Sequence, residues 1–211
     1  MKLSVKRVGG ICRKVIRNRF DLLRLKNKDF SILTNHCMGG IIYHDLGLKF
    51  LSPTINLKIL PDDFVRFLED MDRYLSIPLK EITDSELPYP VGALGDITVY
   101  FVHYHSFAEA NAAWEKRKQR INKNNLRIMM TTRDGCSPDT LTRFEALPYE
   151  HKVFFSNEPH KQCPSCHWAR LDNGKPLPGY ISDIVSVFGK RAFQCNGFDY
   201  IRFLNGDKQR N

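Results

Sequence analysis

Chemically reactive side chains gather between Asn35 and Gly40, where a predicted strand gives way to a helix. Cys37 is the thiol of this segment, with His36 before it and Gly39 and Gly40 after it. A thiol at the start of a helix lies near the positive end of the helix dipole, and glycines let a substrate approach backbone N–H groups. The pattern predicts a cysteine nucleophile of the acyl-transfer type, with Asn35 and the glycines contacting substrate. A small buried thiol or a binding loop also fits these residues.

Histidines that could serve this thiol as a base lie beside it and further along the chain. His36 adjoins the thiol, and His103 follows a predicted strand over residues 97–102. His103 and His105 project to the same side if that strand continues through them. A metal site there is weakly indicated, because no carboxylate lies between them. We predict His36 or His103 as the catalytic base.

A second polar cluster, Arg133-Asp134-Gly135-Cys136, follows a predicted strand over residues 126–130. Arg133 offers a cation for a phosphate or carboxylate, and Asp134 could orient it or a histidine. We therefore predict Asp134 as a catalytic residue and Arg133 as a substrate-binding one. An ordinary turn with an exposed arginine fits the same residues.

Three further side chains are candidates for substrate binding. Arg117 and Arg120 are three residues apart on a predicted helix over residues 107–121, so they share a face that could hold a nucleotide or pyrophosphate. A solvated helix face fits equally. Asp96 or Asp134 would be the base if the protein transferred a glycosyl or sugar-phosphate group instead of an acyl group.

The segment Cys163-Pro164-Ser165-Cys166 has the thiol spacing of a zinc knuckle. A second close pair is missing, so His160, His167 or Cys195 would have to complete the ligands. We predict a reduced, metal-free loop, with a structural zinc as the alternative. The sequence contains no P-loop, no G-x-G-x-x-G after a strand, no G-x-S-x-G and no H-E-x-x-H.

The positive charge is confined to one end of the chain. Residues 1–28 hold ten basic side chains and one acid, which accounts for the whole formal net charge of +9. Apolar residues from Val8 to Leu23 follow helical spacing, so we predict a basic amphipathic arm over residues 1–28 that docks on an anionic membrane. A helix packed on the body with a solvated cationic face is the other interpretation. No recognition motif accompanies the charge, so we do not expect nucleic-acid binding.

The elements that position these residues alternate between strands and helices. Local signals predict a helix that ends at Gly47, a helix capped by Asp62 and a helix that begins at Ser137-Pro138. A chain of 211 residues with 42% hydrophobic and 26% charged residues is typical of a globular protein and has no apolar run long enough to cross a bilayer. We predict one domain over residues 29–205 with an irregular insertion at 159–180. The rhythm indicates an α/β fold, Rossmann-like in three layers, with a largely parallel sheet flanked by helices. Reduced thiols and the lack of a signal-peptide core predict a cytoplasmic location, peripheral at the inner face of the membrane.

A parallel sheet would bring the polar clusters together. Ligands bind outside the carboxyl ends of parallel strands. The clusters beginning at Asn35, Arg133 and Ser156 each follow a predicted strand. We therefore place the site on the edge that these strand ends share.

From about Asp29 to Leu204 the sequence resembles a family of bacterial proteins classed as a domain of unknown function and often labelled exopolysaccharide or capsule biosynthesis proteins. The resemblance rests on several blocks in order: Thr34-Asn35-His36-Cys37-Met38-Gly39-Gly40, Ser52-Pro53-Thr54-Ile55-Asn56, Tyr89-Pro90-Val91-Gly92-Ala93-Leu94-Gly95-Asp96-Ile97, His103-Tyr104, Trp114, Arg117, Arg120-Ile121-Asn122 and Arg133-Asp134-Gly135-Cys136. Some members are labelled acetyltransferases, and the Asn-x-Cys-x-Gly-Gly element is similar to a loop of a separate capsule acyltransferase family.

The resemblance implies a transferase that acts on a sugar or a lipid-linked glycan. In the scheme that we favour, an acyl group from a donor such as acetyl-CoA passes through Cys37 to a sugar hydroxyl. The arginines would hold the phosphates of coenzyme A or of a lipid-linked sugar. The alternatives are a glycosyl- or sugar-phosphate transferase and a membrane-docked assembly protein without catalysis.

Overall fold

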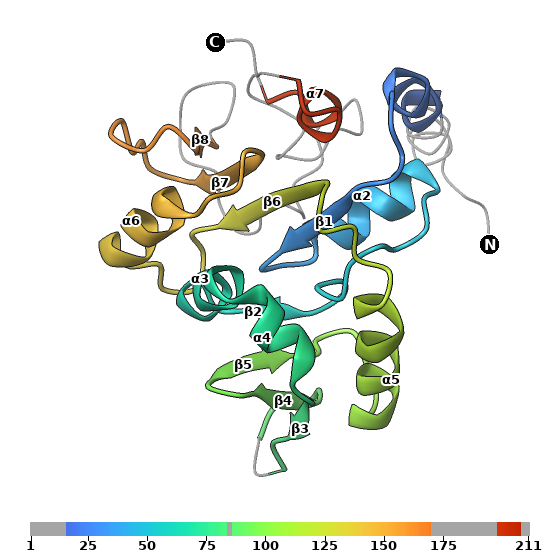
Figure 1. Cartoon of the computed structure of the whole chain (residues 1–211), viewed down its shortest axis with the longest axis vertical. Coiled ribbons are helices and arrows are strands. Elements are labelled where there is room, and N and C mark those ends of the chain that lie inside the picture. The colour runs from blue at the N-terminus through green and yellow to red at the C-terminus, as the bar shows by residue number, and fades with distance from the viewer. Residues whose placement is uncertain (1–15, 84–85, 170–197, 208–211) are drawn as a thin grey trace, which may run out of the picture.

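The computed structural model describes residues 16–83, 86–169 and 198–207, which build two sheets and the helices around them (Figure 1). The first sheet has the strand order β1-β6-β7-β8, and every pair in it is parallel. Its strands are β1 (Ser31–Thr34), β6 (Leu126–Thr131), β7 (Lys152–Ser156) and β8 (Cys166–Trp168). Every residue of β1 and β6 is buried, as expected for a parallel sheet covered on both faces. The predicted α/β fold with a parallel sheet is confirmed.

Alternate residues along the parallel strands point to opposite faces of the sheet. On one face Ile32, Met129 and Phe155 join a core cluster with α2 (Met38–Leu46) and α7 (Tyr200–Leu204). These two helices therefore form the layer that covers this face.

The opposite face of the sheet packs on a second group of helices. Leu33, Ile128 and Phe154 share a core cluster with α3 (Pro61–Glu69) and α6 (Pro138–Ala146). The same cluster extends into the second sheet, so both sheets are joined by continuous apolar packing.

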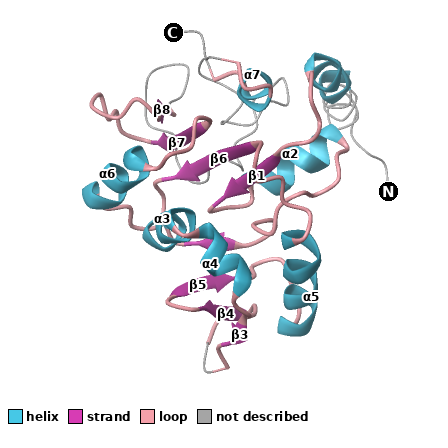
Figure 2. Ribbon diagram, viewed as in Figure 1, coloured by secondary structure: helices cyan, strands magenta, loops and turns pink. Residues whose placement is uncertain are grey.

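The second sheet lies at the lower end of the molecule in Figure 2, beyond α3, and all its strand pairs are antiparallel. Its order is β2-β5-β4-β3, and α4 (Met71–Ser76) and α5 (Phe107–Lys118) lie beside it. The strands are β2 (Lys58–Ile59), β3 (Lys80–Glu81), β4 (Val91–Leu94) and β5 (Ile97–Tyr100). The strand expected near 97–102 therefore exists, but it pairs outside the parallel sheet.

A two-residue turn, Gly95-Asp96, joins β4 to β5 in an antiparallel hairpin. Gly95 has φ +65°, a conformation that favours glycine and suits a tight hairpin. This turn makes β4 and β5 antiparallel. The predicted alternation of strands and helices did not include this hairpin.

Helix ends follow local sequence signals. Ser137 caps α6 by accepting a hydrogen bond from the Thr140 N–H, with Pro138 at the first helical position as predicted. Gly47 ends α2 with φ +65°, also as predicted. The expected cap of α3 is wrong: the helix begins at Pro61, and Asp62 lies in its first turn, where it binds Arg66.

Two predicted segments are described only in part. Residues 170–180 of the predicted irregular insertion lie outside the described residues, whereas residues 166–168 are not irregular but form β8. Residues 1–15 of the predicted arm also lie outside the described part. Residues 16–24 form the predicted helix, and Asp21 in it accepts a hydrogen bond from the Tyr200 hydroxyl (2.7 Å).

Candidate functional site

The strand ends expected to share an edge do so, because β1, β6 and β7 run parallel and adjacent. We call the residues that follow these ends the rim; they are 35–37, 132–136 and 157. Asn35 is 1% exposed and uses its side chain within the sheet: Nδ2 donates to the Thr131 carbonyl (3.0 Å), and Oδ1 accepts from the Thr131 N–H (2.9 Å). Asn35 therefore ties β1 to β6 at the rim.

His36 and Asp134 meet across the rim, with 3.4 Å between His36 Nε2 and Asp134 Oδ2. Asp134 sits in a left-handed turn with φ +66°, which directs its carboxylate between His36 and Arg133. Burial lowers the pKa of His36, and this effect outweighs the opposing effect of Asp134. The lowered pKa favours the neutral imidazole, and with the neutral ring the contact with Asp134 is a hydrogen bond rather than an ion pair.

Cys37 lies 3.1 Å from His103, measured from Sγ to Nε2. The thiol is partly exposed and His103 is exposed, so this pair is accessible to a ligand. The expectation that His103 and His105 extend a strand is wrong, because β5 ends at Tyr100 and His103 lies in the following turn. Because His103 lies in this turn and not in a strand, its side chain contacts the Cys37 thiol.

The contact between Cys37 and His103 depends on the second sheet. The Ile59 N–H in β2 donates to the carbonyl of Asn35 at the end of β1 (3.1 Å). In turn β2 pairs with β5, with Lys58 opposite Tyr100, and the turn after β5 carries His103. A chain of backbone hydrogen bonds thus connects the end of the parallel strand to the turn that carries the imidazole.

Cys37 is the N-cap residue of α2, and the next three residues begin the helix. Their backbone N–H groups have no acceptor within the helix and point out of its end. The two glycines fit close packing: a Cβ on Gly39 would lie 3.2 Å from Thr34, and one on Gly40 would lie 2.7 Å from Asn56 Oδ1. The glycines therefore let α2 approach β1 and the Ile55–Asn56 turn, while the first-turn N–H groups remain beside the thiol.

Lys58 is a rim-facing cation that the sequence did not single out. Its ammonium lies 4.8 Å from the centre of the Tyr100 ring and contributes to the lowered pKa of His36. It has no carboxylate partner among the described residues. Polar and apolar residues alternate over residues 54–60, and Lys58 is one of the polar positions. This alternation was the only feature of the sequence that could have indicated its place.

Asp96 lies apart from the rim. In the β4–β5 turn its carboxylate accepts hydrogen bonds from Arg73 (3.0 Å) and the Tyr74 hydroxyl (2.9 Å), both on α4. The structure thus gives this side chain a role in holding the hairpin against α4.

Ser156, at the end of β7, lies 3.0 Å from His160, measured from Oγ to Nε2.

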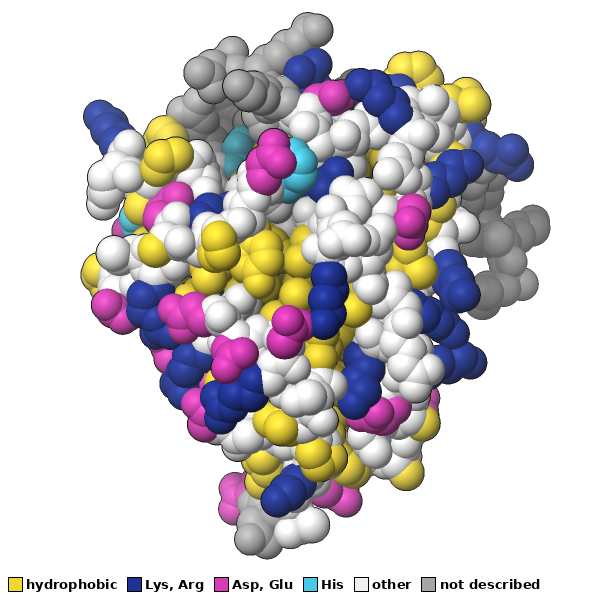
Figure 3. Space-filling model, in the orientation of Figure 1, with side chains coloured by type: hydrophobic (Ala, Val, Ile, Leu, Met, Phe, Trp, Pro, Cys, Tyr) yellow, Lys and Arg dark blue, Asp and Glu magenta, His cyan; other side chains and the backbone are white. Residues whose placement is uncertain are grey.

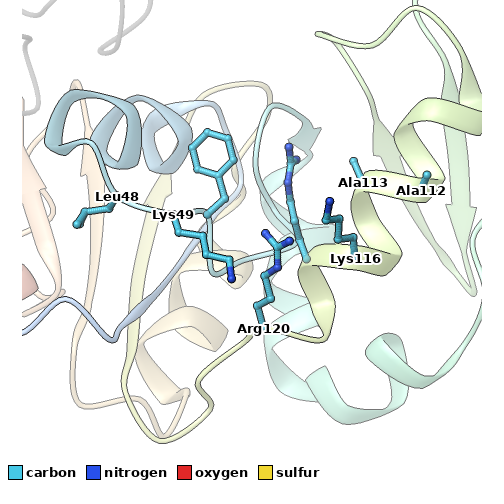
Figure 4. Close-up of a pocket in the computed structure, with 8 residues that line it drawn as sticks. Leu48, Lys49, Ala112, Ala113, Lys116 and Arg120 are labelled. Atoms are coloured by element: carbon cyan, nitrogen blue, oxygen red, sulfur yellow. The ribbon is translucent and has the colours of Figure 1, made fainter.

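Arg117 and Arg120 line a pocket between α5 and the chain after α2, and we call it the cationic pocket (Figure 4). It encloses about 520 Å³. Lys49 and Lys116 add two cations that the sequence analysis missed. In the structure α5 ends at Lys118, so the predicted shared helix face does not hold for Arg120, which lies in the turn after the helix. Lys116 lies on α5 next to Arg117, whereas Lys49 comes from a separate segment.

Cys163 and Cys166 form a tight turn in which the Cys166 N–H donates to the Cys163 carbonyl (3.0 Å). Burial raises the pKa of both thiols. Within residues 16–83, 86–169 and 198–207, no three His, Cys, Asp or Glu side chains gather where they could hold a metal. Cys195 lies outside those ranges.

Comparisons with known proteins identify the family. A family model described as a domain of unknown function, DUF1919, matches residues 10–205. A relative from Haemophilus influenzae, described as an uncharacterized protein, is 36% identical over 188 residues, which is 89% of this chain and 90% of the relative. The chain therefore belongs to the DUF1919 family.

Proposed function

We propose that the protein transfers an acyl group to a sugar hydroxyl through Cys37. The observation that carries the proposal is the 3.1 Å contact between Cys37 Sγ and His103 Nε2 at the start of α2. A thiol within hydrogen-bond reach of an imidazole, beside a helix N-terminus, is the arrangement of an activated cysteine nucleophile.

In the first half-reaction His103 accepts the thiol proton, and Cys37 Sγ attacks the acyl carbonyl of the donor. The new S–C bond gives a tetrahedral intermediate whose oxyanion is stabilised by the N–H groups of the first turn of α2. The bond to the donor's leaving group then breaks, and His103 returns the proton to that group. An acyl-Cys37 thioester and the free donor thiol remain.

In the second half-reaction a sugar hydroxyl gives its proton to His103 while its oxygen attacks the thioester carbonyl. The S–C bond breaks, Cys37 regains the proton, and the ester leaves. His36 and Asp134 line the same rim but contact each other, so we assign His36 to positioning the acceptor rather than to the thiol. Lys58 and Arg133 add positive charge at that side of the rim.

The acceptor class rests on the sequence blocks that resemble exopolysaccharide and capsule biosynthesis proteins. A sugar offers hydroxyl groups that a neutral imidazole, a carboxylate and an arginine can hydrogen-bond. His36, Asp134 and Arg133 supply these three groups at one place.

Trapping the acyl-enzyme tests this proposal. The protein is incubated with acetyl-CoA without an acceptor, and the intact mass and the Cys37 peptide are measured. We expect one added acetyl group on Cys37, its absence in Cys37→Ala, and unchanged labelling in the control Cys136→Ala. Acetylation that persists in Cys37→Ala, or none in the wild-type protein under conditions in which acetyl-CoA binds, would contradict a cysteine nucleophile.

We further propose that the helix over residues 16–24 docks the protein on an anionic membrane. Ile16, Phe20 and Leu23 recur at helical spacing on one face and are 69%, 59% and 86% exposed. Figure 3 shows apolar side chains protruding at the upper right, where Figure 1 places this helix. The other interpretation of the sequence was a helix whose apolar face packs on the rest of the protein. These three residues do not pack in that way, because they are exposed.

The other side of this helix is fastened to the body, which fixes the orientation of the exposed face. Asp21 is 6% exposed and binds Tyr200, and Arg17 lies 3.8 Å from Asp45 on α2. This exposed apolar face belongs to residues 1–28, which carry the whole net charge of +9. The combination matches the chemistry of an anionic lipid surface. Among the described residues no helix is both long and apolar enough to cross a bilayer.

Sedimentation with vesicles tests the docking. We expect binding to vesicles containing phosphatidylglycerol, weaker binding to pure phosphatidylcholine, and loss of binding in Ile16→Ser/Phe20→Ser/Leu23→Ser. Ile82→Ser, which changes an exposed apolar residue in another region, is the matched control. Equal binding by the triple variant and the control would reject this face as the docking surface.

A glycosyl- or sugar-phosphate transferase is the second candidate, and the cationic pocket favours it because a leaving pyrophosphate needs cations. Asp134 remains at the rim as a possible base, whereas Asp96 is held by α4 away from it. Turnover of a nucleotide-sugar by Cys37→Ala would favour this candidate over acyl transfer.

A further inference from the structure

We infer that the cationic pocket binds a diphosphate group of a larger ligand. Four basic side chains line it: Lys116 and Arg117 from α5, Lys49 from the chain after α2, and Arg120 from the turn after α5. The apolar Leu48 and Phe50 also line it. The inference is independent of acyl transfer, because it concerns binding at a place other than the thiol.

The charge in the pocket is not neutralised by the protein. Lys49, Lys116 and Arg120 make no ion pair with a carboxylate within residues 16–83, 86–169 and 198–207. By contrast, neighbouring Lys118 on the same helix is paired with Glu115 (2.8 Å). Cations gathered without counter-charge repel one another, and an anion with several charges relieves that repulsion.

Arg117 is set rigidly at the inner side of the pocket. Its Nη1 donates to the Ile55 carbonyl (3.2 Å) and to the Tyr104 hydroxyl (2.5 Å), and its guanidinium lies 5.1 Å from the centre of the Phe50 ring. Both hydrogen bonds use one nitrogen and both acceptors are uncharged, so the guanidinium keeps its charge and its other N–H donors for a ligand. A preorganised guanidinium is suited to a phosphate oxygen.

The other cations reach the ligand position from two directions. Figure 4 shows the Lys49 side chain, from the chain after α2, and the Arg120 side chain, from the end of α5, directed toward one another. Cations on two opposing segments can bind two adjacent phosphate groups at once, whereas a single carboxylate would leave part of the charge unmatched. The volume of about 520 Å³ exceeds that of a diphosphate, so the pocket also has room for the group to which it is attached.

The pocket adjoins the rim through a shared segment. Tyr104 holds Arg117 at the pocket, and its neighbour His103 contacts Cys37. A ligand anchored by its diphosphate would therefore lie next to the turn that carries the imidazole. Three classes of ligand carry a diphosphate group of this kind: coenzyme A, a nucleotide-sugar and a polyprenyl diphosphate lipid.

Titration calorimetry with inorganic pyrophosphate tests the inference on the full chain. We expect saturable binding that weakens with added salt, and at least a tenfold loss of affinity in Lys116→Glu/Arg120→Glu. Lys161→Glu/Lys123→Glu makes the same charge change at exposed sites outside the pocket and should bind as the wild type does. Thermal unfolding of both double variants verifies that they fold.

Three further arms identify the source of the diphosphate: coenzyme A, UDP, and a polyprenyl diphosphate in neutral vesicles. Any ligand that binds tighter than pyrophosphate and competes with it identifies the attached group. Absence of pyrophosphate binding, or equal binding by the two double variants, overturns the inference. Cys37→Ala should bind pyrophosphate unchanged, so failure of the nucleophile proposal and failure of this inference give different results.

Discussion

The rim of the parallel sheet and the cationic pocket differ in how their reactive side chains are partnered. At the rim Cys37 contacts His103, and His36 contacts Asp134. In the pocket none of the four basic side chains has an acidic partner within the described ranges. Groups that already bond to one another are organised before a substrate arrives, whereas unpaired cations gain most when an anion binds. In our proposals the rim is therefore the site of chemistry and the cationic pocket is a site of binding.

The largest expected effect is the loss of turnover when the thiol is removed. Cys37→Ala should reduce acyl transfer by about a thousandfold or more, because it removes the thiol that forms the thioester in our proposal. Turnover with acetyl-CoA and a polysaccharide acceptor measures it. Cys136→Ala should keep its activity, and a similar loss in both variants would indicate damage to the fold instead.

The two rim pairs should differ in their effect on chemistry. His103→Asn should lower kcat by roughly 10²–10⁴-fold through loss of the base, whereas His36→Asn should act mainly on the KM of the acceptor. Separate kcat and KM values for both variants give the test. If His36→Asn lowered kcat more than His103→Asn, the assignment of the base would be reversed.

Changes in the cationic pocket should affect binding rather than turnover. Arg120→Glu should raise the KM of a diphosphate-bearing donor about tenfold and leave kcat nearly unchanged, since the pocket does not touch the reacting atoms. Lys161→Glu is the matched control. A fall in kcat with constant KM would place Arg120 in the chemistry and remove the distinction between the two regions.

A smaller effect is expected where α2 packs on the turn at Asn56. Gly40→Ala should lower the free energy of unfolding by about 1–3 kcal/mol, because the new Cβ would lie 2.7 Å from Asn56 Oδ1. Asn56→Gly removes that oxygen and suits the φ of +61°, so the double variant should be more stable than the sum of the single changes predicts. Strict additivity in urea unfolding would exclude this contact as the cause.

The smallest effect concerns pH. Burial lowers the pKa of His36 below the ordinary 6.5, so the unfolded chain binds more protons as the pH falls through 6.5 toward the folded value. The protein should therefore lose stability over that window. His36→Asn should flatten the slope of unfolding free energy against pH, leaving the part due to His151, whose pKa burial also lowers. An unchanged slope would show that the pKa of His36 is the same in the folded and unfolded protein, contrary to this expectation.

The sequence predicted the parts of the fold that have local signals. Buried strands ending in polar clusters identified the rim, and the Ser137-Pro138 start and the Gly47 end identified helix boundaries. The antiparallel sheet was not predicted, although Gly95-Asp96 is a hairpin signal. Periodicity indicates a strand, but its neighbours depend on packing over long separations.

Pairings within the site could be predicted only in part. The prediction offered two histidines for Cys37, and the choice of His103 depends on the pairing of β2 with the end of β1 and with β5. Asp96 is held by α4, a contact that no local pattern encodes. Lys49 joins the pocket from a loop whose path depends on the packing of Phe50 against Tyr43 and Arg117.

The rate at which iodoacetamide alkylates each cysteine at neutral pH tests the central claim most directly. Burial and Asp62 raise the pKa of Cys136 to about 11, so that thiol should react slowly and serve as the internal reference. We predict that Cys37 reacts much faster than Cys136 in the wild-type protein and that His103→Asn removes most of this advantage. Equal rates for the two thiols, or a Cys37 rate that His103→Asn leaves unchanged, would contradict an activated nucleophile at the start of α2.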